Sequence, residues 1–304
     1  MRPVPMYVLS KKYGRLCNRL FNAAHLLALA IERKHTFVNV AFYDYADCFQ
    51  ATQQDILCRY PVRKGFIQNY KPVGMVLYYL TYCFACFVYY LPRLAVNGLR
   101  WRTIRGPAGG DDLVLDVPSF PLLNGLPDTA HVIFFQGWNL RAHHSLQKHG
   151  DRIREYFTPL PRYRARVNEF ILTVREGCDV LVGVVIRHGD YRTWLNGQYF
   201  YSLETYAALM KQVEELFGGR KTKFIICSDE EQDTTVFAAA KMDFCFRSGH
   251  MIENLYSLAE CDYIVSPPST YGMWASFYGK VPLYLIDDPA QRISTTDSFA
   301  VCEG

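Results

Sequence analysis

The feature of the sequence that most constrains the fold is a regular alternation of short apolar stretches with helical patterns in the second half of the chain. The stretches at 180–186, 223–227, 263–266 and 281–286 have the length and the β-branched residues of buried strands, and a shorter one lies around 243–247. Strands that alternate with helices form parallel sheets, because each crossover helix returns the chain to the same edge. The sequence therefore predicts an α/β fold.

The first half of the chain begins with the same pattern. An apolar strand at 6–9 is followed by helical spacing of apolar residues over 18–31, and strand-like alternation returns at 36–42. A further strand is expected at 131–136 and a short helix at 151–157. These elements also fit a layered α/β domain.

The length of the chain and two prolines near its middle predict two domains. At 304 residues the chain is long enough to build two hydrophobic cores. The prolines of TPLPRYRARV interrupt the pattern where a second domain could begin. We therefore expect one domain at 1–160 and another at 161–304.

Composition argues against a nucleic-acid-binding protein and suggests a reducing compartment. The net charge of +4 is only mildly basic, and no basic run or RNA-binding signature supports a nucleic-acid partner. The ten cysteines lack the spacing of a disulfide framework or of a zinc site, which indicates reduced thiols. The N-terminus lacks an apolar stretch long enough for a signal peptide. We expect a cytoplasmic protein.

An uncharged stretch of about membrane-spanning length extends from Val73 to Leu91. It is rich in Tyr and Phe, whereas spanning helices are usually richer in Leu, Ile and Val. Three interpretations are open: a spanning helix, an interfacial helix that enters one leaflet, and a helix buried in the protein. The second would make the chain a peripheral protein on the inner face of the membrane.

The strand at 180–186 ends abruptly in a polar cluster, Arg187-His188-Gly189-Asp190-Tyr191. In open α/β sheets, ligands bind at the carboxyl ends of the strands, so this cluster is expected to face a bound molecule. An arginine is planar, permanently charged and suited to phosphate. A structural Arg–Asp pair would explain the same residues.

Two other junctions between a strand and a helix have the chemistry of an anion site. Gly14 lies in the first such loop and Asn18 near the start of the following helix, where free backbone N–H groups attract anions. Ser269 and Thr270 stand at the start of the helix that follows the strand at 263–266. Ordinary helix capping would account for both junctions.

Taken together, these motifs resemble those of the α-1,2-fucosyltransferase family and its relatives in the wider fucosyltransferase superfamily. GRLCNRLFNAA resembles that family's G-[GR]-L-G-N-Q-[LM]-F, and VIRHGDY resembles its H-x-R-x-G-D-Y. CSDE resembles its F-S-D-D, and PSTYGMW its N-S-T-F-S-W-W. The ordered set covers nearly the whole chain.

The resemblance implies a GT-B architecture, in which two Rossmann-like domains with parallel sheets face a central cleft. Residues 1–160 would form the acceptor side, and residues 161–304 would bind the nucleotide-sugar. The implied reaction is an inverting, metal-independent transfer of fucose from GDP-fucose to a hydroxyl of a glycan or lipid-linked oligosaccharide. No cofactor is expected, and the sequence holds no D-x-D metal motif.

The resemblance also assigns residues to the site. Arg187 would contact the donor diphosphate and stabilise charge on the leaving GDP, with His188 and Asp190 as further catalytic candidates. The base for the acceptor hydroxyl stays open among His188, Asp190, Asp44 and Asp47. The donor-binding residues would be Gly14, Arg15, Asn18, Arg187, Ser228, Asp229, Ser269, Thr270 and Tyr271.

The sequence departs from the family's motifs at several positions. Val185 replaces the leading His, Cys17 a Gly, Arg19 a Gln, Pro268 an Asn and Gly272 a Ser. Diphosphate binding remains compatible with these changes. Two alternatives therefore stay open: a transferase for a different nucleotide-sugar, and a non-catalytic relative that binds a nucleotide-sugar.

Overall fold

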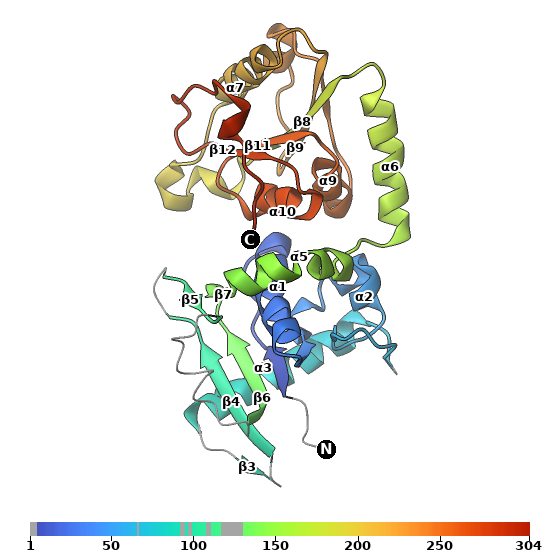
Figure 1. Ribbon diagram of the computed structural model, residues 1–304, viewed down its shortest axis with the longest axis vertical. Helices are drawn as coiled ribbons and strands as arrows, with labels where there is room; N and C mark the ends of the chain where they lie inside the picture. The colour runs from blue at the N-terminus through green and yellow to red at the C-terminus, as the bar shows by residue number, and fades with distance from the viewer. Residues whose placement is uncertain (1–4, 66, 92–94, 97–98, 108–110, 117–129) are drawn as a thin grey trace. The chain divides into compact units, whose positions relative to one another are not determined.

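The computed structural model describes residues 5–304 apart from 66, 92–94, 97–98, 108–110 and 117–129 (Figure 1). The chain forms two compact units. One contains the residues up to Leu160 together with Glu303–Gly304, and the other is Pro161–Cys302. Each unit has its own, mainly parallel, five-stranded sheet. The acceptor and donor roles given above to the two domains stay predictions.

The sheet of the first unit has the order β2-β1-β6-β4-β3, and only β3 runs antiparallel to its neighbour. Its strands are β1 Met6–Leu9, β2 Thr36–Val38, β3 Ala95–Val96, β4 Leu99–Arg105 and β6 Ala130–Gln136. A second small sheet pairs β5 Leu113–Val114 with β7 Leu140–Arg141. The helices are α1 Leu16–Glu32, α2 Gln50–Gln53, α3 Lys71–Tyr90 and α5 His143–Tyr156.

Helix α1 is the buried helix of this unit. Apolar or small side chains occupy nearly all of its faces, and every residue from Leu20 to Ile31 is buried. A helix that is apolar all round must be covered on all sides. Here α1 packs against α5 and against β1, β2 and β7.

The second unit is a doubly wound sheet with the order β10-β9-β8-β11-β12, parallel throughout. Its strands are β8 Val180–Ile186, β9 Thr222–Ser228, β10 Phe244–Phe246, β11 Tyr263–Ser266 and β12 Leu283–Leu285. Its helices are α6 Pro161–Arg175, α7 Leu203–Leu216, α8 Thr235–Ala239, α9 Met251–Leu258 and α10 Thr270–Gly279.

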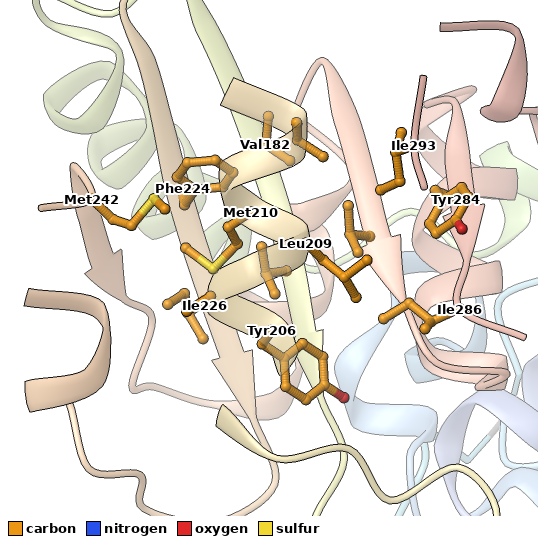
Figure 2. Close-up of a cluster of buried hydrophobic side chains, with 14 of the residues drawn as sticks. Val182, Tyr206, Leu209, Met210, Phe224, Ile226, Met242, Tyr284, Ile286 and Ile293 are labelled. Atoms are coloured by element: carbon orange, nitrogen blue, oxygen red, sulfur yellow. The ribbon is translucent and has the colours of Figure 1, made fainter. Parts of the chain in front are cut away.

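Helix α7 covers one face of this sheet through a dense apolar cluster (Figure 2). Tyr206 and Met210 of α7 are fully buried with Val182 of β8 and Phe224 of β9. Helix α9 lies on the opposite face, where a Cβ at Gly183 would stand 2.6 Å from the Leu258 side chain. Since β8 is buried on both faces, it fixes the position of the loop that follows it.

Several elements of the first unit differ from the sequence-based expectation. Only Thr36–Val38 of the strand expected at 36–42 forms, because Val40–Phe42 turns into a short 3-10 helix. The helix expected at 151–157 begins earlier, at His143. Strand β4, Leu99–Arg105, was not expected.

Helix α3 confirms that the uncharged stretch is helical, and its exposure argues against a helix that is buried in the protein. Among the described helices, α3 is the one that is long and apolar enough to cross a membrane, by length and composition alone. Only 22% of its apolar window is buried. A helix enclosed by the protein would have nearly all of that window covered, so this alternative does not fit.

Candidate functional site

The carboxyl ends of three neighbouring strands in the second unit bring most of the predicted site residues together. The chain moves from β8 to β9 and β10 on one side, and returns to β11 and β12 on the other. The strand order therefore reverses between β8 and β11, the place where parallel sheets bind ligands. Arg187 directly follows β8, Asp229 directly follows β9, and Ser269 caps the helix after β11.

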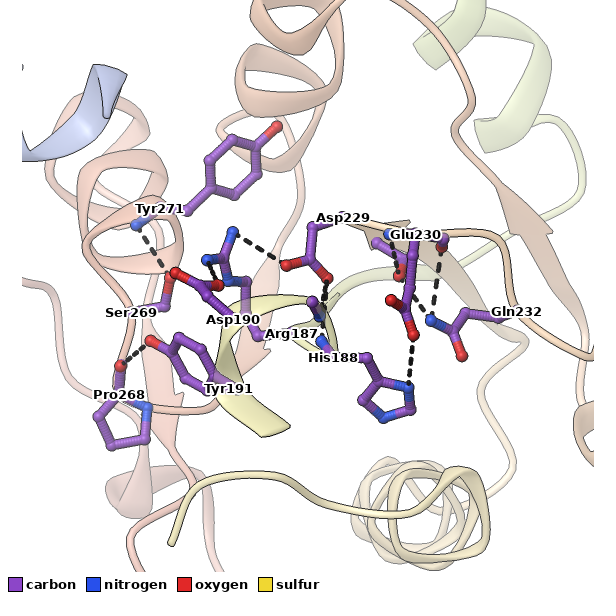
Figure 3. Close-up of polar contacts among 12 residues, drawn as sticks. Arg187, His188, Asp190, Tyr191, Asp229, Glu230, Gln232, Pro268, Ser269 and Tyr271 are labelled. Carbon is purple, nitrogen blue, oxygen red and sulfur yellow. Dashed lines mark hydrogen bonds and ion pairs between the residues drawn. The ribbon is translucent and has the colours of Figure 1, made fainter. Parts of the chain in front are cut away.

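Arg187 is the centre of this cluster (Figure 3). Its Nη2 donates to Oδ1 of Asp190, and its Nη1 lies 3.4 Å from Oδ2 of Asp229. The guanidinium lies over the ring of Tyr191, 5.0 Å from the centroid. Its Nε is buried and has no hydrogen-bond partner among the described residues. A buried N–H without a partner is costly, so an anion that reached this edge of the sheet would gain by pairing with it.

Asp229 fixes the loop on which Arg187 lies. Its Oδ1 accepts hydrogen bonds from the backbone N–H groups of His188, at 2.9 Å, and Gly189, at 3.4 Å. Gly189 also gives this carboxylate room, because a Cβ there would stand 3.0 Å from Oδ2 of Asp229. A donor-binding role for Asp229 stays a prediction, and its contacts in this structure are those of a residue that positions the Arg187 loop.

Tyr191 joins the loop after β8 to the loop after β11. Its hydroxyl donates to the carbonyl oxygen of Pro268 at 2.5 Å. Burial raises the pKa of Tyr191, while a hydrogen bond with the Ser269 side chain and the charge of Arg187 oppose that rise. Tyr191 thus places Arg187 and the start of α10 in one cluster (Figure 3). The sequence places this tyrosine in the strand-end cluster but does not indicate its hydrogen bond to Pro268.

The start of α10 offers the backbone donors of a helix N-terminus. Ser269 is the N-cap, and its Oγ accepts from the backbone N–H of Tyr271 at 3.2 Å. Thr270 is the first helical residue, and the Tyr271 hydroxyl donates to the carbonyl oxygen of Met251. Of these residues, Ser269 is the one whose side chain joins the Arg187 cluster (Figure 3).

The packing of α10 explains why position 272 holds a glycine where the similar motif has a serine. A Cβ at this position would stand 2.4 Å from Oγ of Ser266 and 3.7 Å from the side chain of Val185. Two departures from the family motif, Val185 and Gly272, are therefore neighbours in the fold. Together they allow α10 to approach the ends of β8 and β11 closely.

His188 points away from the guanidinium. Its side chain is buried, and its Nε2 lies 2.7 Å from the carbonyl oxygen of Tyr201. Its ring packs on Phe200 at 4.5 Å between centroids, and its Nδ1 lies 3.9 Å from Glu230. This geometry favours a positioning role for His188 over direct proton transfer. Its catalytic role stays untested.

Ser228 lies at the end of β9, beside Asp229 in sequence, but its side chain has other partners. Its Oγ accepts from the backbone N–H of Glu230, at 3.3 Å, and from Nε2 of Gln232, at 3.0 Å. These bonds close the turn after β9 (Figure 3). Ser228 therefore shapes the loop next to the Arg187 cluster.

Gly14, Arg15 and Asn18 form a separate group at the start of α1 in the first unit. Gly14 has a φ of +61°, and a Cβ there would stand 2.2 Å from Nδ2 of Asn18. Both the left-handed backbone and the close approach require glycine. Asn18 and Arg15 are exposed, so their side chains are open to solvent.

Both alternative carboxylates of the first unit are paired with cations. Asp44 pairs with Arg19 at 2.6 Å and Lys12 at 3.3 Å. Burial raises the pKa of Asp44, but the Arg19 and Lys12 interactions outweigh burial and lower it. Asp47 pairs with Lys71 at 3.1 Å. Within the described residues, no three His, Cys, Asp or Glu side chains gather as a metal site would require.

Comparisons with known proteins define the class of fold. No protein-family model matches the chain, and no curated protein matches its sequence. A mutant of Arabidopsis thaliana FUT1 in complex with GDP has a TM-score of 0.62 at 12% identity, covering 98% of this chain and 74% of that one. NodZ α-1,6-fucosyltransferase soaked with GDP-fucose has a TM-score of 0.55 at 13% identity, covering 93% and 95%.

A third structure, POFUT1 in complex with GDP, has a TM-score of 0.50 at 14% identity and covers 91% of this chain and 94% of its own. At such identities, likeness establishes the fold alone. The chain has the α/β architecture of GT-B fucosyltransferase structures, and the predicted fold class is confirmed. The comparisons do not single out the α-1,2 subfamily.

Proposed function

We propose that this chain is a fucosyltransferase that moves fucose from GDP-fucose to a hydroxyl of a glycan or lipid-linked oligosaccharide. The observation that carries the proposal is Arg187 at the switch point of the second sheet, with a buried Nε that lacks a partner among the described residues. The GDP and GDP-fucose in the structures of similar fold support a guanosine diphosphate donor.

The proposed mechanism follows from the charges that develop when the donor is cleaved. Cleavage of the bond between fucose and diphosphate builds negative charge on the β-phosphate and positive character on the sugar ring. Arg187 and the N–H groups at the start of α10 are fixed donors that meet the negative charge without a metal ion. Because these donors are held before the substrate binds, little reorganisation is needed during the reaction.

The other residues of the cluster act through Arg187. Asp190 and Asp229 each pair with the Arg187 guanidinium, which lies over the ring of Tyr191. An incoming diphosphate would replace part of these carboxylate contacts. We propose an inverting transfer, in which the acceptor hydroxyl attacks from the face of the sugar opposite the diphosphate.

A panel of nucleotide-sugars tests the proposal. GDP-fucose, GDP-mannose and UDP-sugars are supplied to the wild type and to Arg187→Ala, and the release of the nucleoside diphosphate, GDP or UDP, is measured. The wild type should prefer GDP-fucose. Arg187→Ala should lose about 2–4 kcal/mol of transition-state stabilisation, or roughly 30- to 1,000-fold in rate.

Arg175→Ala is the matched control. Arg175 is also ion-paired, to Asp262 at 3.0 Å, but Asp262 precedes β11 and lies at the opposite edge of the sheet. This variant should keep the wild-type rate. Turnover of a UDP-sugar in preference to GDP-fucose would favour a different transferase, and binding without turnover would favour a non-catalytic relative.

A further inference from the structure

Helix α3 presents an apolar face that the first unit does not cover. The exposed side chains recur at three- and four-residue intervals on one side of the helix, where a globular protein normally places polar residues. Leu80 is 64% exposed and Phe87 is 54% exposed. The face is formed by Val73, Val76, Leu80, Phe87 and Tyr90.

The opposite face of α3 is attached to the unit along its length. Near the start, Gly74 lies against Tyr43, since a Cβ at Gly74 would be 2.9 Å from the Tyr43 Cβ. Near the middle, the Thr103 hydroxyl of β4 donates to the carbonyl oxygen of Ala85 at 2.7 Å. A helix held in this way cannot cross a bilayer unless β4, with Arg102, enters the hydrocarbon, which is very costly. It can lie in the interface with one face in the lipid.

The charge around α3 matches an anionic surface. Residues 56–110 contain eight of the 33 Lys and Arg residues and none of the 29 Asp and Glu residues. The basic charge of the protein is thus concentrated on both sides of the helix in sequence. Arg63, Lys64 and Arg100 are exposed among these cations, and Lys71 is exposed but pairs with Asp47 at 3.1 Å. Basic residues beside an aromatic-rich apolar helix are typical of attachment to anionic lipid.

We propose that α3 is an interfacial helix that docks the first unit on the surface of a bilayer containing anionic lipid. The apolar face enters the acyl boundary, and the flanking cations contact the headgroups. A lipid surface accounts for the absence of charge on the exposed face of α3, for its aromatic content and for its basic flanks.

A cavity of about 320 Å³ opens beside this helix, at the carboxyl ends of β1, β4 and β6. Tyr82 of α3 lines it, together with the cations Lys11 and Arg105 and the half-exposed Trp138. The Arg105 guanidinium also stacks on Tyr89 of α3, 3.8 Å from the ring centroid. An aromatic ring and two cations suit an anionic glycan. If the proposed function holds, docking through α3 would bring this cavity to a membrane-borne acceptor that carries negative charge.

Vesicle flotation with the full chain tests the docking. The wild type should float with vesicles of phosphatidylcholine and phosphatidylglycerol, and less with phosphatidylcholine alone or in high salt, which screens the charges. The double variant Leu80→Glu and Phe87→Glu should lose at least about tenfold in partition, because both side chains would otherwise be buried in lipid. Leu172→Glu, at an apolar residue that is 75% exposed on α6, is the matched control and should float like the wild type.

Equal flotation of the wild type and the double variant would overturn the proposal, as would no flotation of the wild type. Sedimentation analysis without vesicles tests whether a second copy covers the face: a wild-type dimer that the double variant dissociates would also overturn it. Should the glutamates impair folding, as seen by circular dichroism, Leu80→Ser with Phe87→Ser makes the same test. GDP binding by the second unit reports on the proposed function separately, and the double variant should retain it.

Discussion

Replacement of Asp229 separates the two contributions that its carboxylate makes to the Arg187 loop. Asp229→Ala removes the acceptor for the His188 N–H at 2.9 Å and the ion pair with Arg187 at 3.4 Å, whereas the longer Gly189 contact adds little. A hydrogen bond to a charged group contributes about 1.5–3 kcal/mol. With a weaker ion pair added, Asp229→Ala should lower the free energy of unfolding by about 2–4 kcal/mol. Asp229→Asn keeps an oxygen acceptor and should cost about 1 kcal/mol.

Thermal and urea unfolding of the two variants provide the assay. At about 2–4 °C per kcal/mol for a domain of this size, Asp229→Ala should lower Tm by roughly 4–16 °C. Asp243→Ala is the control, because the Asp243 side chain is 66% exposed and its ion pair with Lys223 is long, with Oδ1 3.8 Å from Nζ. Such a surface pair contributes about 0–1 kcal/mol. A loss in Asp229→Ala no greater than in the control would refute the role of Asp229 as the residue that fixes the loop.

Three further predictions concern backbone, packing and pH. Gly14→Ala forces an L side chain into a left-handed conformation and against Asn18, so urea unfolding should show a loss of about 1–3 kcal/mol. Gly272→Ser should lower Tm because it collides with Ser266, and adding Ser266→Gly should restore much of the loss; no recovery would contradict the packing explanation. His25 has a pKa lowered to about 3, chiefly by burial and then by neighbouring positive charge. Below about pH 6.5 the unfolded chain therefore binds a proton at His25 that the folded chain does not bind. As the pH is lowered from about 6.5 to about 3, the free energy of unfolding should decrease by up to about 1.4 kcal/mol per pH unit. His25→Asn should flatten that slope in urea unfolding measured between pH 7 and pH 5, and an unchanged slope would count against His25 as its source.

The second unit could be predicted well because its signals are local. Strands such as Val180–Ile186 are short, β-branched and flanked by clear helices, so periodicity alone finds them. The first unit was harder for an identifiable reason. Strand β4, Leu99–Arg105, alternates with arginine on one face, and Trp101 on the other packs against Phe84 of α3, a contact that no local pattern reveals.

The candidate site was predicted in part. The strand-end motifs located Arg187 and Ser269, and topology explains why two segments so distant in sequence meet at one edge. The partner of each side chain depends on tertiary structure. The link through Tyr191 and the inward turn of His188 toward Tyr201 follow from how the loops fold, which residue spacing does not encode.

A structure of the complex with GDP tests the central claim most directly, since the claim concerns where the diphosphate lies. Oxygens of the β-phosphate should lie within about 3 Å of the Arg187 guanidinium, next to the start of α10 at Ser269. A nucleotide bound elsewhere, with the Arg187 side chain still engaged only by Asp190 and Asp229, would contradict the account.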